Sequence, residues 1–158
     1  MLHAIKASAI AILSLVFAHA AWAAGDHMVV KIRPGSFADA REAVEMAITG
    51  RGFVINNVSH IGNMLERTGK DVGDGKKVFV QAEALEFCSA TVSRQMMESD
   101  PDNIVFCPYI IAIYVVPEKP GEARISYRKT QIVGSAESKK ALTAVNSLLD
   151  EITQEALQ

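Results

Sequence analysis

The chain has 158 residues, of which 49% are hydrophobic and 22% charged, and its formal net charge at pH 7 is −2. This length and composition predict one globular domain with a substantial core. The slightly acidic balance and the lack of a basic run argue against nucleic acid as a partner, because phosphate binding needs clustered Lys and Arg side chains.

Residues 1–23 resemble a secretory leader. Lys6 gives a short basic start, residues 7–18 are apolar, and Ala21-Trp22-Ala23 forms an A-x-A cleavage pattern. About a dozen apolar residues are too few to cross a bilayer, which takes roughly 20. We therefore expect a signal peptide, a single domain over residues 24–158, and a periplasmic or secreted protein without a stable membrane anchor after cleavage.

A strand and then a helix are predicted at the start of this domain. Residues 28–33 alternate in a way that puts Met28, Val30 and Ile32 on one face of a strand. Ser36 then has the pattern of a helix N-cap. The apolar side chains that follow at helical spacing are Phe37, Ala40, Val44, Ala47 and Ile48. They predict a helix that packs on the core.

The middle of the chain predicts several short elements and one long strand. The short elements are a strand at 53–61, a short helix at 62–70, a charged loop at 69–77, a strand at 78–87, a helix from Cys88 or Ser89 to Ser99, and a turn at 100–103. Residues 104–116 are nearly all apolar. They predict a central strand that is covered on both faces.

The C-terminal part predicts a strand at 124–133 and a final helix capped by Ser135. The apolar stripe of that helix is Leu142, Val145, Leu149, Ile152 and Ala156. The order β-α-β-(α)-β-α-β-β-α predicts an α+β domain with a single antiparallel-rich sheet backed by helices. A parallel pair flanking a crossover helix stays open as an alternative. The cleft between the sheet and the final helix is the default pocket of such a fold.

The two cysteines, Cys88 and Cys107, admit three interpretations. In an oxidising compartment, an even cysteine count favours a structural disulfide between them. Alternatively, the start of a helix lowers the pKa of a thiol, which would make Cys88 a reactive nucleophile with Cys107 as its resolving partner. The chain has no C-x-x-C motif, so a thioredoxin-type site is excluded.

The third interpretation is a soft-ligand site. Thiolates and thioethers suit Cu(I), and the available sulfur atoms belong to Met64, Cys88, Met96, Met97 and Cys107. Cys107-Pro108 is also similar to a short element of some haem-thiolate sites. Methionines at these positions equally suit packing between a helix and a sheet, so we assign no metal or cofactor. The candidate ligand-site residues are Cys88, Met96, Cys107, Pro108 and Tyr109.

No recognised catalytic motif is present in the sequence. It lacks a G-x-S-x-G elbow and an H-E-x-x-H helix, and no Ser/His/Asp set stands out. His60, Glu83 and Glu86 are expected to be hydrogen-bonded or solvated surface residues. We therefore assign no catalytic residue and favour binding over enzymatic activity.

The chain resembles the family called domain of unknown function 302. The residues that carry this resemblance are 37–53, 85–89, Met96-Met97, Ser99-Asp100-Pro101, 105–109 and 112–114. The similarity covers about residues 28–132. It implies an α+β domain similar to the TATA-binding-protein-like and helix-grip folds, in which a curved sheet grips a long helix. It also implies a homodimer, and the cysteines resemble a secreted subgroup associated with sulfur-compound oxidation.

The sequence thus predicts an exported α+β domain that binds a small ligand or a partner as a homodimer. One alternative is a periplasmic thiol/disulfide or sulfur-compound-handling protein that uses Cys88 and Cys107. A copper or haem carrier is the other alternative.

Overall fold

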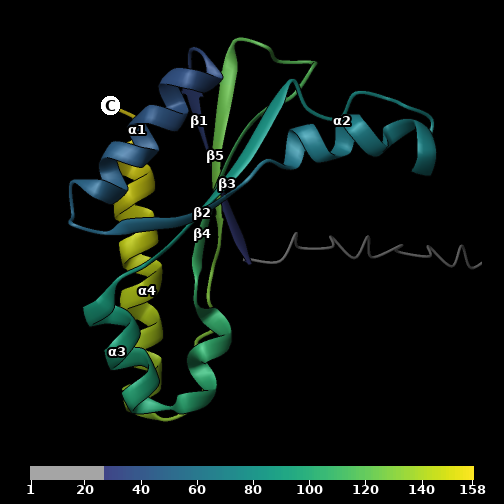
Figure 1. Ribbon diagram of the computed structural model, residues 1–158. Coiled ribbons are helices and arrows are strands. Elements are labelled where there is room, and N and C mark those ends of the chain that lie inside the picture. The colour runs from purple at the N-terminus through teal and green to yellow at the C-terminus, as the bar shows by residue number, and fades with distance from the viewer. Residues whose placement is uncertain (1–26) are drawn as a thin grey trace, which may run out of the picture.

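The computed structural model describes residues 27–158, and the predicted signal peptide lies outside these residues. The described part contains five strands, four α-helices and one 3₁₀-helix (Figure 1). In chain order they are β1 (Met28–Pro34), α1 (Phe37–Thr49), β2 (Val54–Ser59), α2 (Ile61–Val72), β3 (Gln81–Cys88), α3 (Ala90–Ser99), η1 (Pro101–Phe106), β4 (Tyr109–Val115), β5 (Glu122–Arg128) and α4 (Ala136–Glu155).

The strands form one sheet in the order β1-β5-β4-β3-β2. Each neighbouring pair is antiparallel, so the predicted antiparallel-rich α+β fold is confirmed and the parallel pair left open is not present among the described residues. β4 lies at the centre of the sheet. A register shift between Ile55 and Asn57 interrupts the pairing of the edge strand β2 with β3.

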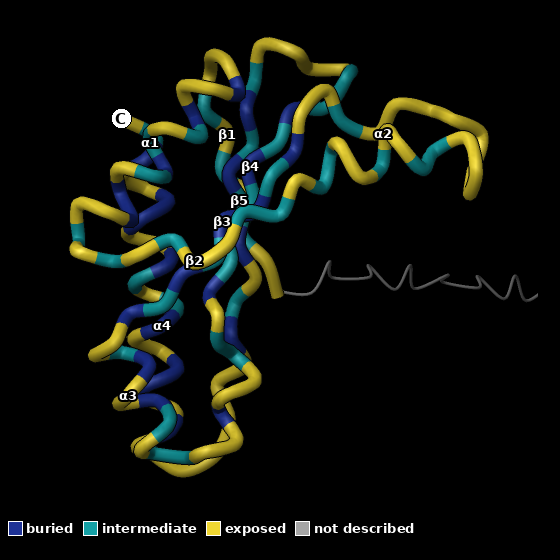
Figure 2. The backbone as a smooth tube through the Cα atoms, viewed as in Figure 1, coloured by how far each residue is buried: buried dark blue, intermediate teal, exposed yellow. Residues whose placement is uncertain are grey.

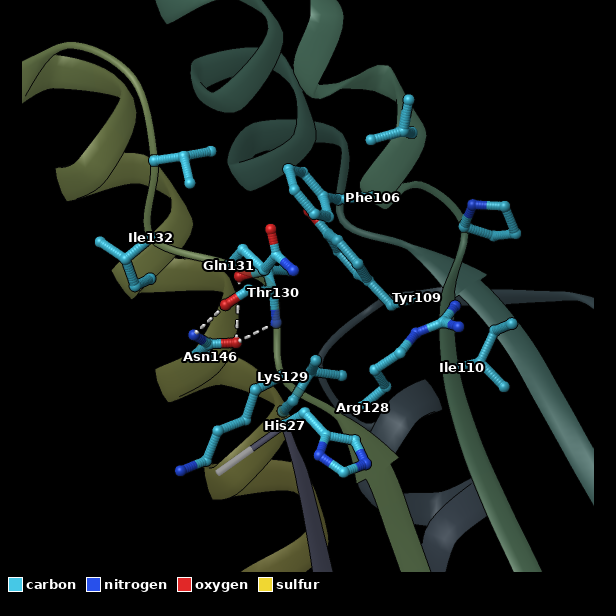
Figure 3. A pocket seen from close by; sticks show the side chains of 14 residues that line it. His27, Phe106, Tyr109, Ile110, Arg128, Lys129, Thr130, Gln131, Ile132 and Asn146 are labelled. Atoms are coloured by element: carbon cyan, nitrogen blue, oxygen red, sulfur yellow. Dashed lines mark hydrogen bonds between the residues drawn. The ribbon is translucent and has the colours of Figure 1, made fainter. Parts of the chain in front are cut away.

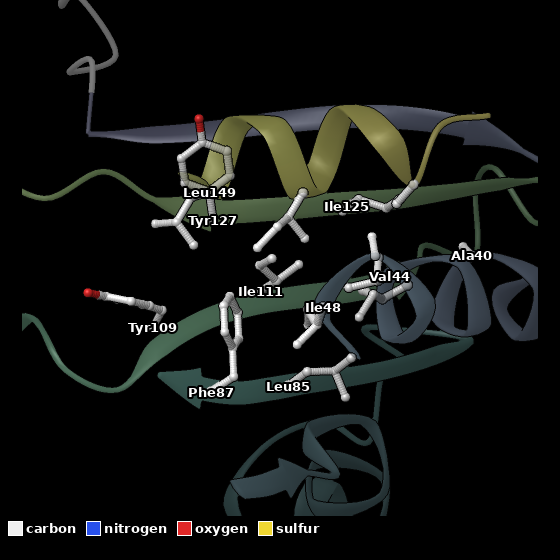
Figure 4. Close-up of a cluster of buried hydrophobic side chains, with 14 of the residues drawn as sticks. Ala40, Val44, Ile48, Leu85, Phe87, Tyr109, Ile111, Ile125, Tyr127 and Leu149 are labelled. Atoms are coloured by element: carbon white, nitrogen blue, oxygen red, sulfur yellow. The ribbon is translucent and has the colours of Figure 1, made fainter. Parts of the chain in front are cut away.

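Helices α1, α3 and α4 lie on one side of the sheet, and the core lies between them and the strands (Figures 1 and 2). The predicted apolar stripes of α1 and α4 are confirmed, because every member of both stripes is buried. Figure 4 shows side chains of α1, among them Val44 and Ile48, meeting Leu85, Ile111 and Ile125 of the sheet. This layer fixes α4 against the ends of β4 and β5.

The helix starts follow the predicted serines. The side chains of Ser36, Ser89 and Ser135 accept hydrogen bonds from the backbone N–H groups three residues on, at 3.1, 3.3 and 3.1 Å. Such caps satisfy N–H groups that have no partner inside the helix. The N-cap of α3 is Ser89, so Cys88 is the residue directly before the cap.

The other side of the sheet is largely uncovered. The side chains of Met28, Val30 and Ile32 share one face of β1, as predicted, and this face is exposed. Among the described residues, α2 is the helix that projects on that side, next to β3 (Figure 1), and it has no buried residue. Within residues 27–158, no helix has the length and apolar character required to cross a bilayer.

The predicted strand at 104–116 is wrong in its first third. Residues 104–106 belong to η1, and β4 begins only at Tyr109. Pro101 stands in the first turn of η1, and the Asp100 side chain accepts a hydrogen bond from the Asp102 N–H at 3.0 Å, which extends the predicted turn into a 3₁₀-helix. Burial along β4 alternates, because helices cover only one face of the sheet.

The predicted strand at 124–133 is also too long. β5 ends at Arg128, and residues 129–133 form an irregular connection to α4. The backbone N–H of Thr130 donates to the Asn146 side chain of α4 rather than to a neighbouring strand. The loss of sheet pairing at this point opens space between the connection and β4.

Candidate functional site

A cavity of about 980 Å³ lies between the connection at 129–133, the start of β4 and α4 (Figure 3). Its position agrees with the pocket expected between the sheet and the final helix. The strands supply Tyr109, Ile110 and Arg128, and α4 supplies Asn146 and Leu149. A volume of this size is within the range of pockets that enclose small organic ligands.

The cavity has a basic end and an apolar end. Figure 3 shows His27, Arg128 and Lys129 gathered at one end, and Phe106 and Ile132 at the other. The residues that line this cavity include no Asp or Glu. A negatively charged group would therefore meet attraction at the basic end, and no lining carboxylate would oppose it.

Asn146 fastens the connection to α4 and so holds one wall of the cavity. Its side-chain oxygen accepts from the N–H and the hydroxyl of Thr130 at 2.8 and 3.1 Å, and its Nδ2 donates to the Thr130 carbonyl at 3.1 Å. The Thr130 hydroxyl also lies 3.1 Å from the Leu142 carbonyl oxygen. These contacts replace the sheet pairing that residue 130 lacks, which leaves the neighbouring side chains free to face the cavity.

Tyr109 connects the cavity to the core. Its side chain is buried, with 2% of its surface exposed, and its ring packs edge-on against Phe87 at a centroid distance of 5.8 Å. Its hydroxyl is hydrogen-bonded to the Ser93 hydroxyl at 3.0 Å. Burial raises the pKa of Tyr109, so the phenol stays protonated at neutral pH. Tyr109 is thus a satisfied core tyrosine that also lines the cavity.

The structure brings Cys88 and Cys107 together as free thiols. Phe87 pairs with Tyr109 across β3 and β4, so the residues just beyond this pair, including both cysteines, come close. The Ser93 hydroxyl lies 3.9 Å from Cys107 Sγ, and Cys107 contributes to the raised pKa of Cys88, so the two cysteines are neighbours. The disulfide between them stays a prediction.

The expected lowering of the Cys88 pKa is not met. Burial raises the pKa of Cys88 to about 11, and the contact with the Cys107 thiol adds to the rise. A backbone hydrogen bond at Tyr109 and one with the Ser93 hydroxyl lower the pKa, but they do not outweigh the burial. Cys88 is consequently a protonated thiol at neutral pH, which weakens its expected role as the nucleophile.

The other sulfur atoms of the proposed copper site are dispersed. Met96 is fully buried in the core, whereas Met64 is on α2, which projects from the other side of the sheet (Figure 1). Among residues 27–158, no group of three or more His, Cys, Asp or Glu side chains is placed to hold a metal ion. The structure therefore gives no copper cage built from all five sulfur atoms.

The polar residues near the start of α2 have structural partners, as predicted. His60 Nδ1 lies 3.0 Å from Glu83 Oε1, and Arg41 Nε lies 2.9 Å from Glu83 Oε2. Glu86 accepts hydrogen bonds from the side chains of Asn57 and Ser59, both at 3.1 Å. Glu83 and Glu86 therefore already have hydrogen-bond or ion-pair partners among the neighbouring side chains.

Of the predicted ligand-site residues, Pro108 and Tyr109 line the cavity. Cys88, Met96 and Cys107 do not line it. Sequence reasoning missed Arg128, Asn146 and the connection at 129–133, because the connection was assigned to a strand. A signal was present: alternation of apolar side chains ends at Tyr127, and four polar residues, Arg128 to Gln131, then follow one another.

Comparison with known proteins yields one family and a similar fold. The family described as "Domain of unknown function DUF302" matches residues 28–157. The chain is similar to the crystal structure of an uncharacterized conserved protein DUF302 from Bacillus stearothermophilus, with a TM-score of 0.69 and 16% sequence identity, over 84% of this chain and 99% of that chain. At this identity the likeness concerns the fold. No match was found among curated proteins.

Proposed function

The chain belongs to the DUF302 family, and from this premise we propose that it is an exported, non-enzymatic domain that binds a small amphipathic anion beside α4. The observation that carries the proposal is the division of the cavity into a basic end and an apolar end. Such a cavity suits a ligand with an apolar body and one carboxylate, sulfate or sulfonate group. The leader-like residues 1–23 support export.

Arg128 is the best placed cation to hold the anionic group. It is exposed at the end of β5, and its guanidinium has no hydrogen bond or ion pair with another residue of the part described. A planar guanidinium can donate two parallel hydrogen bonds to a carboxylate or sulfonate. An unoccupied guanidinium beside an apolar wall is therefore available to a ligand.

The apolar end supplies the second part of the recognition. Phe106, Ile132 and Leu149 line the cavity, and Ile132 leaves 44% of its surface exposed. Covering this surface with an apolar ligand would be favourable at roughly 25 cal/mol per Å² of area removed from water. A ligand of this class would thus be stabilised by an ionic contact at one end of the cavity and by burial of its apolar body at the other.

A fluorescent anion tests this proposal directly. We expect 8-anilinonaphthalene-1-sulfonate to bind the folded chain with increased emission, and decanoate to displace it. Arg128→Gln should weaken the binding at least fivefold, because a charge-assisted hydrogen bond contributes about 1.5–3 kcal/mol. Arg94→Gln is the matched control, because Arg94 is an exposed arginine of α3 outside the cavity.

Equal affinity of the Arg128 and Arg94 variants would contradict the assignment of the anion site. Failure of decanoate to displace the dye would contradict the class of ligand.

The second part of the proposal is a homodimer formed through the uncovered side of the sheet. Met28, Val30 and Ile32 are exposed by 55, 41 and 54%, and they stand in one row on the edge strand β1. A sheet face with apolar residues is usually covered by a second layer. A second copy supplies such a layer by two-fold symmetry, in which the same patch meets itself.

A further inference from the structure

The pair of thiols and the cavity share one short segment of the chain. Phe106, Pro108 and Tyr109 line the cavity, whereas Cys107 between them is not among its lining residues and is a neighbour of Cys88. The Ser93 hydroxyl lies near both features, 3.0 Å from the Tyr109 hydroxyl and 3.9 Å from Cys107 Sγ. A change in the position of Cys107 is therefore transmitted to the cavity wall.

We propose that Cys88 and Cys107 form a reversible disulfide, and that its formation changes the affinity of the cavity for its ligand through residues 106–109. The oxidant is a disulfide R–S–S–R of the compartment. The disulfide itself rests on the strand register, which brings the two cysteines together. The effect on affinity rests on the proposed ligand-binding function.

The strand register makes the two cysteines neighbours. Phe87 and Tyr109 are directly opposed on β3 and β4, so the same register sets Cys88 opposite Pro108, one residue from Cys107. Directly opposed residues on antiparallel strands lie about 4.5–5.5 Å apart, and a disulfide needs Cα atoms about 4.4–6.8 Å apart. A movement of residues 106–109 that brings Cys107 towards Cys88 would join the two thiols.

The oxidation proceeds by two exchanges of sulfur partners. The thiolate of one cysteine attacks one sulfur of R–S–S–R, which forms a mixed disulfide with R and releases RS⁻. The other cysteine then loses its proton to solvent and attacks the sulfur of the first cysteine, which releases the second RS⁻. Both RS⁻ groups take up protons, so two protein thiols are oxidised by two electrons and one R–S–S–R is reduced to two R–SH.

Closing the bond acts on the cavity in two ways. The sulfur atoms move together to a bond length of about 2.05 Å, so Cys107 carries Phe106 and Pro108 with it. The Ser93 hydroxyl also loses a thiol neighbour, which alters its contact with the Tyr109 hydroxyl. Both changes reach residues that line the cavity.

The test compares the reduced and oxidised chain, residues 24–158, after dithiothreitol or oxidised glutathione. Alkylation followed by mass spectrometry counts the free thiols, and 8-anilinonaphthalene-1-sulfonate reports the cavity. We expect two alkylated thiols in the reduced protein, none in the oxidised protein, and a change of at least threefold in dye affinity. The double variant Cys88→Ser/Cys107→Ser should bind the dye equally under both conditions.

The possible failures are distinguishable from one another. Two alkylated thiols after oxidised glutathione, or bound copper that protects both thiols, would overturn the disulfide. A disulfide without any change in dye affinity would overturn the coupling alone. Loss of dye binding in both redox states would count against the proposed ligand-binding function, while the count of alkylated thiols would still decide the disulfide.

Discussion

Cys88 is a residue on which two physical effects act in opposite directions. Its position before the capped start of α3 favours the thiolate through the helix dipole. Burial and the neighbouring Cys107 thiol favour the neutral form, and they dominate, so the pKa rises to about 11.

This pKa gives a prediction for stability at high pH. The folded-state value of about 11 lies above the ordinary value of 9.0, so the folded protein holds this proton more tightly than the unfolded chain. The resulting contribution to stability is complete below pH 9 and is lost as the pH rises from about 9 towards 11. For the reduced protein, thermal unfolding at pH 8 and pH 10.5 should show a larger decrease in Tm for wild type than for Cys88→Ser.

A decrease in Tm of equal size in the two proteins would mean that the Cys88 proton does not contribute. The oxidised wild type serves as the control, because its Cys88 has no thiol proton to lose.

At the scale of the elements, different residues of the connection at 129–133 have different roles. Thr130 is tied to Asn146 of α4, while Gln131, Ile132 and Val133 line the cavity. Gly134 ends the connection with φ at +85°, a left-handed conformation that favours glycine, and Ser135 then caps α4. The connection is therefore held at both ends and free in the middle.

Removal of the Asn146 side chain should loosen this element. Asn146→Ala leaves the buried Thr130 N–H without its partner, which costs about 1–3 kcal/mol. We expect a lower Tm and weaker binding of 8-anilinonaphthalene-1-sulfonate. Thr143→Ala is the matched control on α4, because its hydroxyl is bonded only to the Lys139 carbonyl of the same helix. Equal effects of the two substitutions would refute the role of Asn146 in holding the wall.

The elements with regular periodicity could be predicted from the sequence. The helices α1 and α4 have apolar side chains at helical spacing and a serine cap, and both features appear in the structure. The segments at 104–106 and 129–133 could not be predicted in the same way. Their apolar residues fit a strand, but Asp100-Pro101 and Asn146 provide hydrogen bonds that compete with sheet pairing.

The candidate site could be predicted only in part for the same reason. Pro108 and Tyr109 adjoin a recognisable strand, and the two cysteines are distinctive in a chain that has only these two. Arg128 and Asn146 gain their role from the tertiary contact between the connection and α4. Nothing local in the sequence marks that contact.

At the scale of the whole molecule, the fold has one covered and one open side. Among residues 27–158, the helices α1, α3 and α4 bury one face of the sheet, and α2 lies on the other (Figures 1 and 2). On this second face, β1 carries an exposed apolar row. An exposed apolar row on a sheet face is suited to association with another surface.

The proposed homodimer predicts a change of mass on substitution in β1. Val30→Lys/Ile32→Lys places charges on the exposed row, and we expect size-exclusion chromatography with light scattering to give a dimer for wild type and a monomer for this variant. Met46→Lys is the control, because Met46 is an equally exposed apolar residue (59%) on α1. A monomeric wild type, or a dimer that persists in the β1 variant, would contradict the proposed interface.

The connection at 129–133 also has a consequence for how the protein can diversify. Its anchors at Thr130 and Gly134 are separate from the three residues between them, and Gln131, Ile132 and Val133 are all exposed. Substitutions at these three positions can alter the shape and polarity of the cavity at little cost to folding. Descendants of this chain could thus acquire new chemical preferences by point changes in a surface segment, while the scaffold beneath is inherited intact.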